Sequence, residues 1–182
     1  ENNIPTAAGY VLEHVGRAGT LEGVEAEILP QPVADWAGDA GLLQAVLARE
    51  PDLLCLTCQA WNVERNLHLA GQVKRERPGT RIIAGGPEIT PDCQWRHCPA
   101  VDVFVCGEGE TGLPAAREAL SSKRGPHPLF LESPPLENLE GAVDPYSAGF
   151  LHPGPNHNAL VETTRGCPWR CTYCNYSKRS PR

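Results

Sequence analysis

Three short apolar runs at regular intervals constrain the fold of this chain most strongly. They are "DLLCLTC" (52–58), "RIIAGG" (81–86) and "VDVFVCG" (101–107). An uninterrupted apolar run of this length is typical of a strand that is buried on both faces of a parallel sheet. Apolar residues at helical spacing predict a helix over 64–77, between the first two runs, and another helix follows the third run. This alternation predicts a doubly wound parallel α/β sheet, Rossmann-like or flavodoxin-like.

The segments before the first apolar run continue the same alternation. Apolar spacing predicts a helix from Ile4 to Val15, a strand at "VEAEIL" (24–29) and a second helix from Trp36 to Leu47. We therefore expect one α/β domain over residues 1–121.

The pattern changes after this domain. Residues 122–158 are rich in proline and predict a linker. "ALVETTRG" (159–166) predicts a new strand that leads into a cysteine-rich loop, so residues 159–182 are expected to open a second domain.

The flavodoxin-like strand order places a further strand at the centre of the sheet. This strand would lie between 24–29 and 52–58, whereas the sequence begins at the helix that should follow it. We expect an apolar strand before Glu1 and several βα units after Arg182, and we expect residues 1–182 alone to be neither stable nor active.

Composition restricts the partners and the compartment. A net charge of −6 argues against general nucleic-acid binding, and no apolar run approaches the length that spans a membrane. Eight cysteines in an α/β chain indicate a reducing, cytoplasmic compartment, where clustered cysteines act as ligands.

Cys167, Cys171 and Cys174 have the spacing C-x3-C-x2-C. Structural zinc takes four ligands, usually in C-x2-C pairs, and only the last two cysteines have that form. Buried structural cysteines are a second interpretation, which does not explain three thiols in a polar loop. An iron–sulfur cluster is the third, since three thiolates would leave one iron open for chemistry. The segment from Arg165 to Arg182 contains five cationic residues, both of these arginines included, and no acidic residue. These charges would offset the negative charge of such a cluster.

The stretch "ETTRGCPWRCTYC" (162–174) resembles the signature of the radical S-adenosylmethionine (SAM) superfamily. The resemblance implies that Cys167, Cys171 and Cys174 hold a [4Fe–4S] cluster, that SAM chelates its fourth iron, and that Tyr173 lies near the adenine. It also implies the start of a TIM-like barrel and a reductant such as flavodoxin or ferredoxin.

The part before the linker resembles the cobalamin-binding domain that precedes the barrel in many radical SAM proteins. The resemblance rests on "PDLLCLTCQAWNVERNL", "IIAGGPEITPD" and "VDVFVCGEGE", in this order and spacing. It implies cobalamin contacts at the strand ends, from Thr57, Trp61, Gly85, Gly86, Gly107 and Glu108.

Several of these residues also have ordinary structural interpretations. The turn at Gly107 and Glu108 could be a tight turn with an acidic helix start, and Trp61 could be a buried anchor. His68 imitates a cobalt-ligating histidine, but it falls within a predicted helix and is not assigned as a ligand. Cys55 and Cys58 lie within a predicted strand and are expected to be structural thiols.

Three functions remain open from the sequence. The first is a cobalamin-dependent radical SAM enzyme, possibly a methyltransferase that acts on an unactivated carbon of a small molecule or peptide. The second is a radical SAM enzyme of other chemistry, whose front domain is a relic that binds no corrinoid. The third is a corrinoid-binding or electron-transfer module without catalysis of its own.

Overall fold

The computed structural model describes residues 4–19, 21–122, 128–137, 139, 144–153, 158–167, 169 and 171–174. Its helices and strands, with one short 3-10 helix (η1), follow in the order α1 (Thr6–Arg17), α2 (Gln31–Trp36), α3 (Asp39–Leu47), β1 (Leu53–Thr57), α4 (Val63–Glu76), β2 (Arg81–Gly85), η1 (Gln94–His97), β3 (Val103–Gly107), α5 (Gly109–Ser122) and β4 (Leu129–Ser133).

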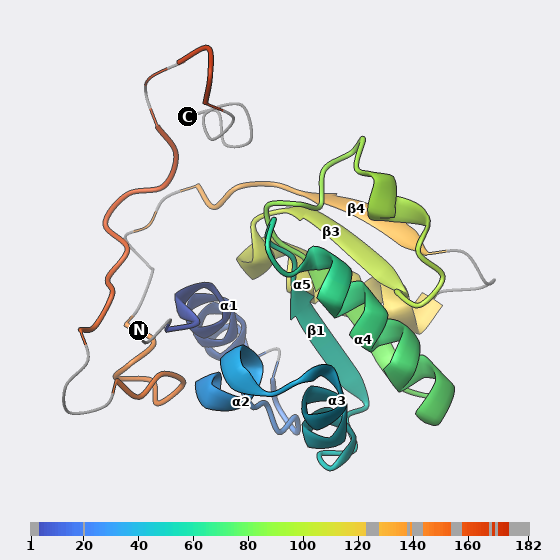
Figure 1. Ribbon diagram of the computed structural model, residues 1–182. Coiled ribbons are helices and arrows are strands. Elements are labelled where there is room, and N and C mark those ends of the chain that lie inside the picture. The colour runs from blue at the N-terminus through green and yellow to red at the C-terminus, as the bar shows by residue number, and fades with distance from the viewer. Residues whose placement is uncertain are drawn as a thin grey trace.

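The strands form one parallel sheet in the order β1-β2-β3-β4 (Figure 1). Thr57 of β1 lies opposite Gly85 of β2, and Gly107 of β3 lies opposite Ser133 of β4. The predicted strands at 52–58, 81–86 and 101–107 and the predicted helix at 64–77 are confirmed within one or two residues. The sequence thus predicted the doubly wound α/β fold correctly.

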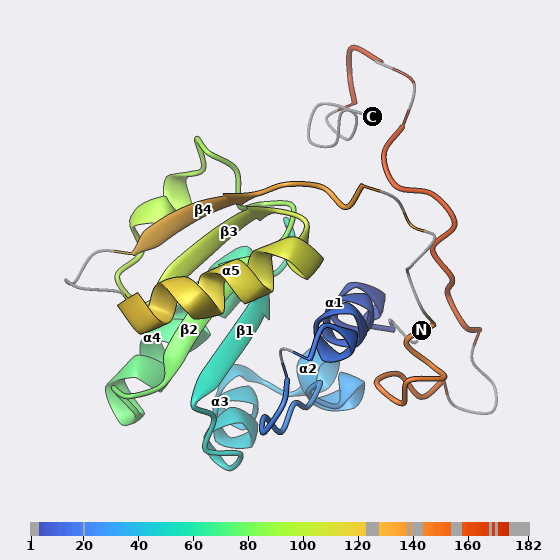
Figure 2. The same cartoon turned by 180° about the vertical axis from the view of Figure 1, so that it is seen from behind.

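Two apolar layers cover the two faces of the sheet. Ile82, Ala84 and Phe104 pack with α3 and α4 on one face, whereas Ile83 and Val105 pack with α5 on the other. Neighbouring residues along β2 and β3 thus point to opposite layers, as the pleat of a strand requires. Figures 1 and 2 show α4 in front of the sheet from one side and α5 in front of it from the other.

The strand predicted at "VEAEIL" (24–29) is not found. Val24 instead closes a turn with Leu21, and Glu27 accepts a hydrogen bond from Arg49. A strand needs a neighbour to satisfy its backbone groups, and no neighbour pairs with this segment among the described residues.

The first apolar run is less buried than predicted. β1 has one neighbour, β2, in the described part of the chain, and Cys55 in its middle is exposed. Residues 24–29 do not pair with it. The strand expected before Glu1 stays a prediction.

β4 lies inside the segment that was predicted to be only a linker. Leu129, Phe130 and Leu131 pair with β3 and pack into both apolar layers. The dense prolines around this short run masked its apolar character. The sheet therefore extends beyond the limit of residue 121 that composition indicated.

The predicted helix from Trp36 to Leu47 is confirmed from Asp39 onward, whereas Trp36 belongs to a separate helix before it. α2 ends at Trp36, and α3 begins at Asp39 after Ala37 adopts an extended conformation. No helix in the described ranges has the length and apolar character that a membrane crossing requires.

Candidate functional site

The carboxyl ends of the strands define one edge of the sheet. Thr57, Gly85, Gly107 and Ser133 are the last residues of β1, β2, β3 and β4. Ligands of open α/β sheets bind at this edge. Four of the residues singled out in the sequence lie on these ends or directly after them, namely Thr57, Gly85, Gly86 and Gly107.

The turn after β1 presents two exposed side chains at this edge. Thr57 is exposed, and its carbonyl accepts a hydrogen bond from the Asn66 side chain at 2.9 Å. Trp61 follows at the start of α4 and is 76% exposed. The interpretation of Trp61 as a buried anchor is therefore wrong. An exposed indole at a ligand edge offers a flat apolar surface to a planar ligand.

The fold itself requires glycine at positions 86 and 107, whether or not a ligand binds there. Gly86 has φ +108°, and a Cβ there would lie 2.7 Å from the carbonyl oxygen of Cys58. Gly107 has φ +115°, and its Cβ would lie 2.3 Å from the carbonyl oxygen of Ser133. Both conformations favour glycine. Neighbouring backbone atoms of Cys58 and Ser133 thus approach these glycines closely, and a cobalamin contact at either glycine stays a prediction.

The β3–α5 turn is held in place by its backbone and by Ser133. The carbonyl of Glu108 accepts a hydrogen bond from the Ser133 hydroxyl at 2.9 Å, and its carboxylate accepts one from the Leu136 amide at 2.8 Å. Glu110 lies in the first turn of α5 and is buried. This position suits an acidic residue, because the helix N-terminus is positively polarised. The interpretation as a tight turn with an acidic helix start is confirmed.

Arg165 occupies the space in front of this turn. Its guanidinium donates to Glu108 at 3.0 Å, to Glu110, and to Glu162 at 2.8 Å. Burial disfavours the charged guanidinium, but the hydrogen bonds and negative charges of Glu110 and Glu162 outweigh this effect and raise the pKa of Arg165 above its usual value. Its charge is therefore already paired, and this corrects the expectation that Arg165 offsets the charge of a cluster.

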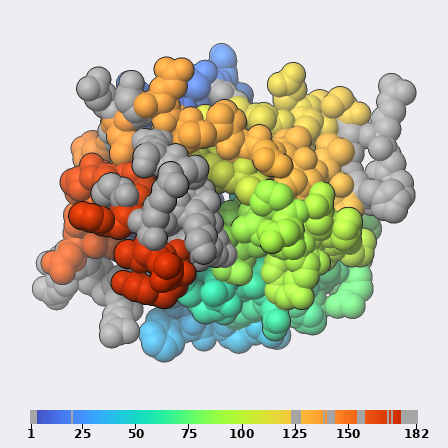
Figure 3. All heavy atoms as spheres, turned by 90° about the horizontal axis from the view of Figure 1, so that it is seen from above, coloured from blue at the N-terminus to red at the C-terminus, as the bar shows by residue number. Residues whose placement is uncertain are grey.

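The segment before the cysteines is attached to the front domain. The Leu160 amide donates to the Tyr146 hydroxyl at 2.8 Å, and the Glu162 amide donates to the Tyr10 hydroxyl at 3.0 Å. The strand predicted over 159–166 is not found, because side chains satisfy these amides and no neighbouring strand does so among the described residues. Figure 3, which is seen from above, shows the described part of this C-terminal segment in red on the surface, at one side of the view.

The three cysteines of the motif are partly buried. The Cys174 amide donates to the Cys171 carbonyl at 3.1 Å, so the second half of the motif forms a turn. Among the residues that the structure describes, no set of three or more His, Cys, Asp or Glu side chains is grouped closely enough to hold a metal ion. Tyr173 is 90% exposed. The assignment of Cys167, Cys171 and Cys174 as ligands thus stays a prediction from their spacing.

Among the other thiols, Cys58 is a structural group. Cys58 is fully buried, and burial, together with Cys93, Cys98 and Glu88 nearby, raises its pKa to about 12. At neutral pH it is a protonated thiol, which is a poor nucleophile. The expectation that Cys58 is a structural thiol is confirmed.

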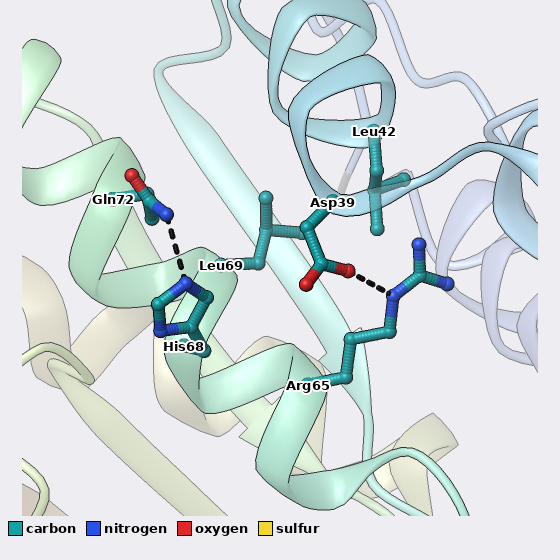
Figure 4. A pocket seen from close by; sticks show the side chains of 6 residues that line it. All are labelled: Asp39, Leu42, Arg65, His68, Leu69 and Gln72. Atoms are coloured by element: carbon teal, nitrogen blue, oxygen red, sulfur yellow. Dashed lines mark hydrogen bonds and ion pairs between the residues drawn. The ribbon is translucent and has the colours of Figure 1, made fainter.

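His68 lies on α4, as predicted, and not in a loop at the strand ends. It is exposed, and its ring is 2.8 Å from the Gln72 side chain. Beside it, Asp39 and Arg65 join α3 to α4 through an ion pair at 2.8 Å (Figure 4). These four side chains, with Leu42 and Leu69, line a small pocket (Figure 4). Its polar side chains pair with one another.

Comparison with known proteins identifies the class that this fold and edge define. The family model of the B12 binding domain matches residues 10–117, which is more than half of the chain, and the chain belongs to this family.

Curated relatives carry more specific names. The chain is similar to 2-(S-pantetheinyl)-carbapenam-3-carboxylate methyltransferase of Streptantibioticus cattleyicolor, with 34% identity over 70% of this chain and 22% of the relative. It is 32% identical to the cobalamin-dependent radical SAM methyltransferase TokK of Streptomyces tokunonensis, again over 70% of this chain and 22% of the relative. It is 27% identical to hopanoid C-3 methylase of Methylococcus capsulatus, over 75% of this chain and 30% of that enzyme.

These relatives confirm the resemblance to cobalamin-domain-containing radical SAM proteins. The chain spans less than a third of the length of each of the three. The comparisons therefore show the family of this chain and not the activity of a whole protein.

Sequence reasoning missed the pairing of Arg165 with Glu108 and Glu110. Arg165 was noted only as one of several cationic residues. The available signal was two glutamates in a turn at the ligand edge, with no cation near them in the sequence. Because 55 residues separate Glu110 from Arg165, only the folded chain shows that they meet.

Proposed function

We propose that this chain is the front domain and cluster loop of a cobalamin-dependent radical SAM methyltransferase. The observation that carries the proposal is the match of the B12 binding domain to the sheet whose strand ends expose Thr57 and Trp61. The names of the relatives support methyl transfer as the reaction class.

The residues at this edge of the sheet have the chemistry that suits a large planar cofactor. Trp61 offers an exposed aromatic face in the turn after β1, and Thr57 is exposed at the end of β1. Gly85, Gly86, Gly107 and Glu108 complete the proposed contact set along the neighbouring strand ends. Cobalamin bound there would supply a cobalt that carries a methyl group.

The cysteine loop is proposed to hold the second cofactor. Cys167, Cys171 and Cys174 would provide three thiolates to a [4Fe–4S] cluster, SAM would occupy the fourth iron, and Tyr173 would lie beside the adenine. A reductant such as flavodoxin or ferredoxin would supply the electron. The substrate would be a small molecule or a peptide.

The visible spectrum of the purified full-length protein tests this proposal. We expect corrin bands together with the broad absorption of an iron–sulfur cluster. Iron–sulfur absorption without corrin binding would instead support radical chemistry behind a relic front domain. Corrin bands with no cluster after anaerobic reconstitution would support a corrinoid-binding module.

Single cysteine variants test the ligand assignment. Because a cubane needs all three thiolates on this loop, Cys167→Ala, Cys171→Ala and Cys174→Ala should each lose most of the bound iron and sulfide. Cys93→Ala is the matched control and should keep them. Near-full iron in any one of the three variants would refute the assignment.

A further inference from the structure

One buried cation joins the ligand edge of the sheet to the start of the cysteine loop. Arg165 is two residues before Cys167, and its side chain is only 14% exposed. Its guanidinium reaches Glu108 and Glu110 across the fold as well as Glu162 beside it. A planar guanidinium can bind several carboxylates at once in a fixed geometry, which a lysine ammonium does not reproduce.

The two glutamates across the fold stand on the β3–α5 turn and the start of α5. Ser133 and Leu136 hold Glu108 from the end of β4, and Gly107 provides the left-handed turn that places it there. Glu110 is 6% exposed at its side chain and sits at the N-terminus of α5. Removal of the guanidinium would leave the buried Glu110 carboxylate and the partly buried Glu108 carboxylate without it, which is costly because buried charges need partners.

The rest of the segment is attached by hydroxyl groups. Tyr146 and Tyr10 bind the amides of Leu160 and Glu162, two residues apart on the chain. Arg165 is the last of these attachments before the cysteines and the one that carries charge. It therefore fixes the direction in which the chain enters the cysteine loop.

We propose that Arg165 is a positioning residue, through which the β3–α5 turn at the ligand edge holds the cysteine loop in place. This inference rests on the proposed function, because that function makes the edge a cofactor site and the loop a cluster site. A corrinoid that contacts the turn would then also restrain residues 158–167. The acidic turn thus acts as the mechanical link between the two cofactor sites.

Hydrogen exchange of the full-length protein, measured by mass spectrometry with and without hydroxocobalamin, tests the link. In Arg165→Met we expect residues 158–167 to exchange at least about tenfold faster, while β3 exchanges as in the wild type. Arg165→Lys keeps the charge but not the planar fork, and we expect an intermediate effect. Arg77→Met, which breaks an exposed ion pair with Glu50, is the matched control and should change neither segment.

The measurements with added hydroxocobalamin distinguish a failure of this inference from a failure of the proposed function. In the wild type, added hydroxocobalamin should slow exchange in 158–167, and in Arg165→Met it should bind without slowing that segment. If the wild type binds no corrinoid but Arg165→Met still loosens 158–167 alone, the attachment stands and the proposed function fails. Unchanged exchange in Arg165→Met, or equal loosening of 158–167 and β3, would overturn the positioning role.

Discussion

The fold itself limits which residue types can stand at the strand ends. Gly86 cannot carry a side chain without meeting the backbone of Cys58, whose amide also donates to the Gly85 carbonyl at 2.6 Å. The sequence named Gly86 as a cobalamin contact but did not show that the Cys58 backbone requires a glycine there. A change at Gly86 therefore disturbs the joint between β1 and β2 before it can report on a ligand.

Two glycine substitutions should have opposite effects on stability. Gly86→Ala combines a clash with a left-handed backbone and should cost at least about 2 kcal/mol. Gly71 lies inside α4 with open space around its Cβ position, so Gly71→Ala should stabilise the protein by about 1 kcal/mol. Urea denaturation measures both. A Gly86→Ala protein as stable as the wild type would contradict the described joint.

At the scale of elements, the three apolar runs and their order in the sheet were predicted well, whereas the strand pairing of other segments was not. β1, β2, β3 and α4 have clear patterns, because burial acts directly on local residue choice. The segments 24–29 and 159–166 have strand-like residues but no strand neighbour in the described structure. β4 shows the converse, since a short apolar run between prolines gains a neighbour in β3. Pairing is a property of the whole fold, and one segment cannot reveal it.

Asp102 secures α4 against the sheet. Its carboxylate accepts hydrogen bonds from Lys74 at 2.6 Å and from the Ile82 amide at 2.8 Å, and its side chain is 8% exposed. Asp102→Ala should therefore cost about 3 kcal/mol, because it leaves a partly buried ammonium and a buried amide without this acceptor.

The control for the Asp102→Ala variant is a variant at an exposed ion pair on the surface. Glu50→Ala removes an exposed ion pair with Arg77, whose two side chains are 74% and 37% exposed, and should cost less than about 0.5 kcal/mol. The midpoint of thermal unfolding compares the two variants. Equal shifts would show that the Asp102 network is not a buried attachment.

At the scale of the whole molecule, the chain brings the segment before the cysteines to the edge where the strands end, because Arg165 there pairs with Glu108 and Glu110. The sequence predicted the edge, because strands of a parallel sheet end together, and it predicted the loop from three cysteines. It could not predict that Glu108 and Glu110 meet Arg165, since this contact depends on the path of the chain after β4. The central claim is that the edge binds a corrinoid.

Equilibrium titration of hydroxocobalamin, followed by its visible bands, tests this claim most directly. Trp61 is exposed in the turn after β1, whereas His68 lies on α4, where its ring is hydrogen-bonded to the Gln72 side chain. We expect Trp61→Ala to bind at least about tenfold more weakly than the wild type, which corresponds to about 1.4 kcal/mol of lost aromatic contact. We expect His68→Ala to keep both the affinity and the cobalt spectrum. Wild-type affinity in Trp61→Ala, or a changed cobalt spectrum in His68→Ala, would contradict the account.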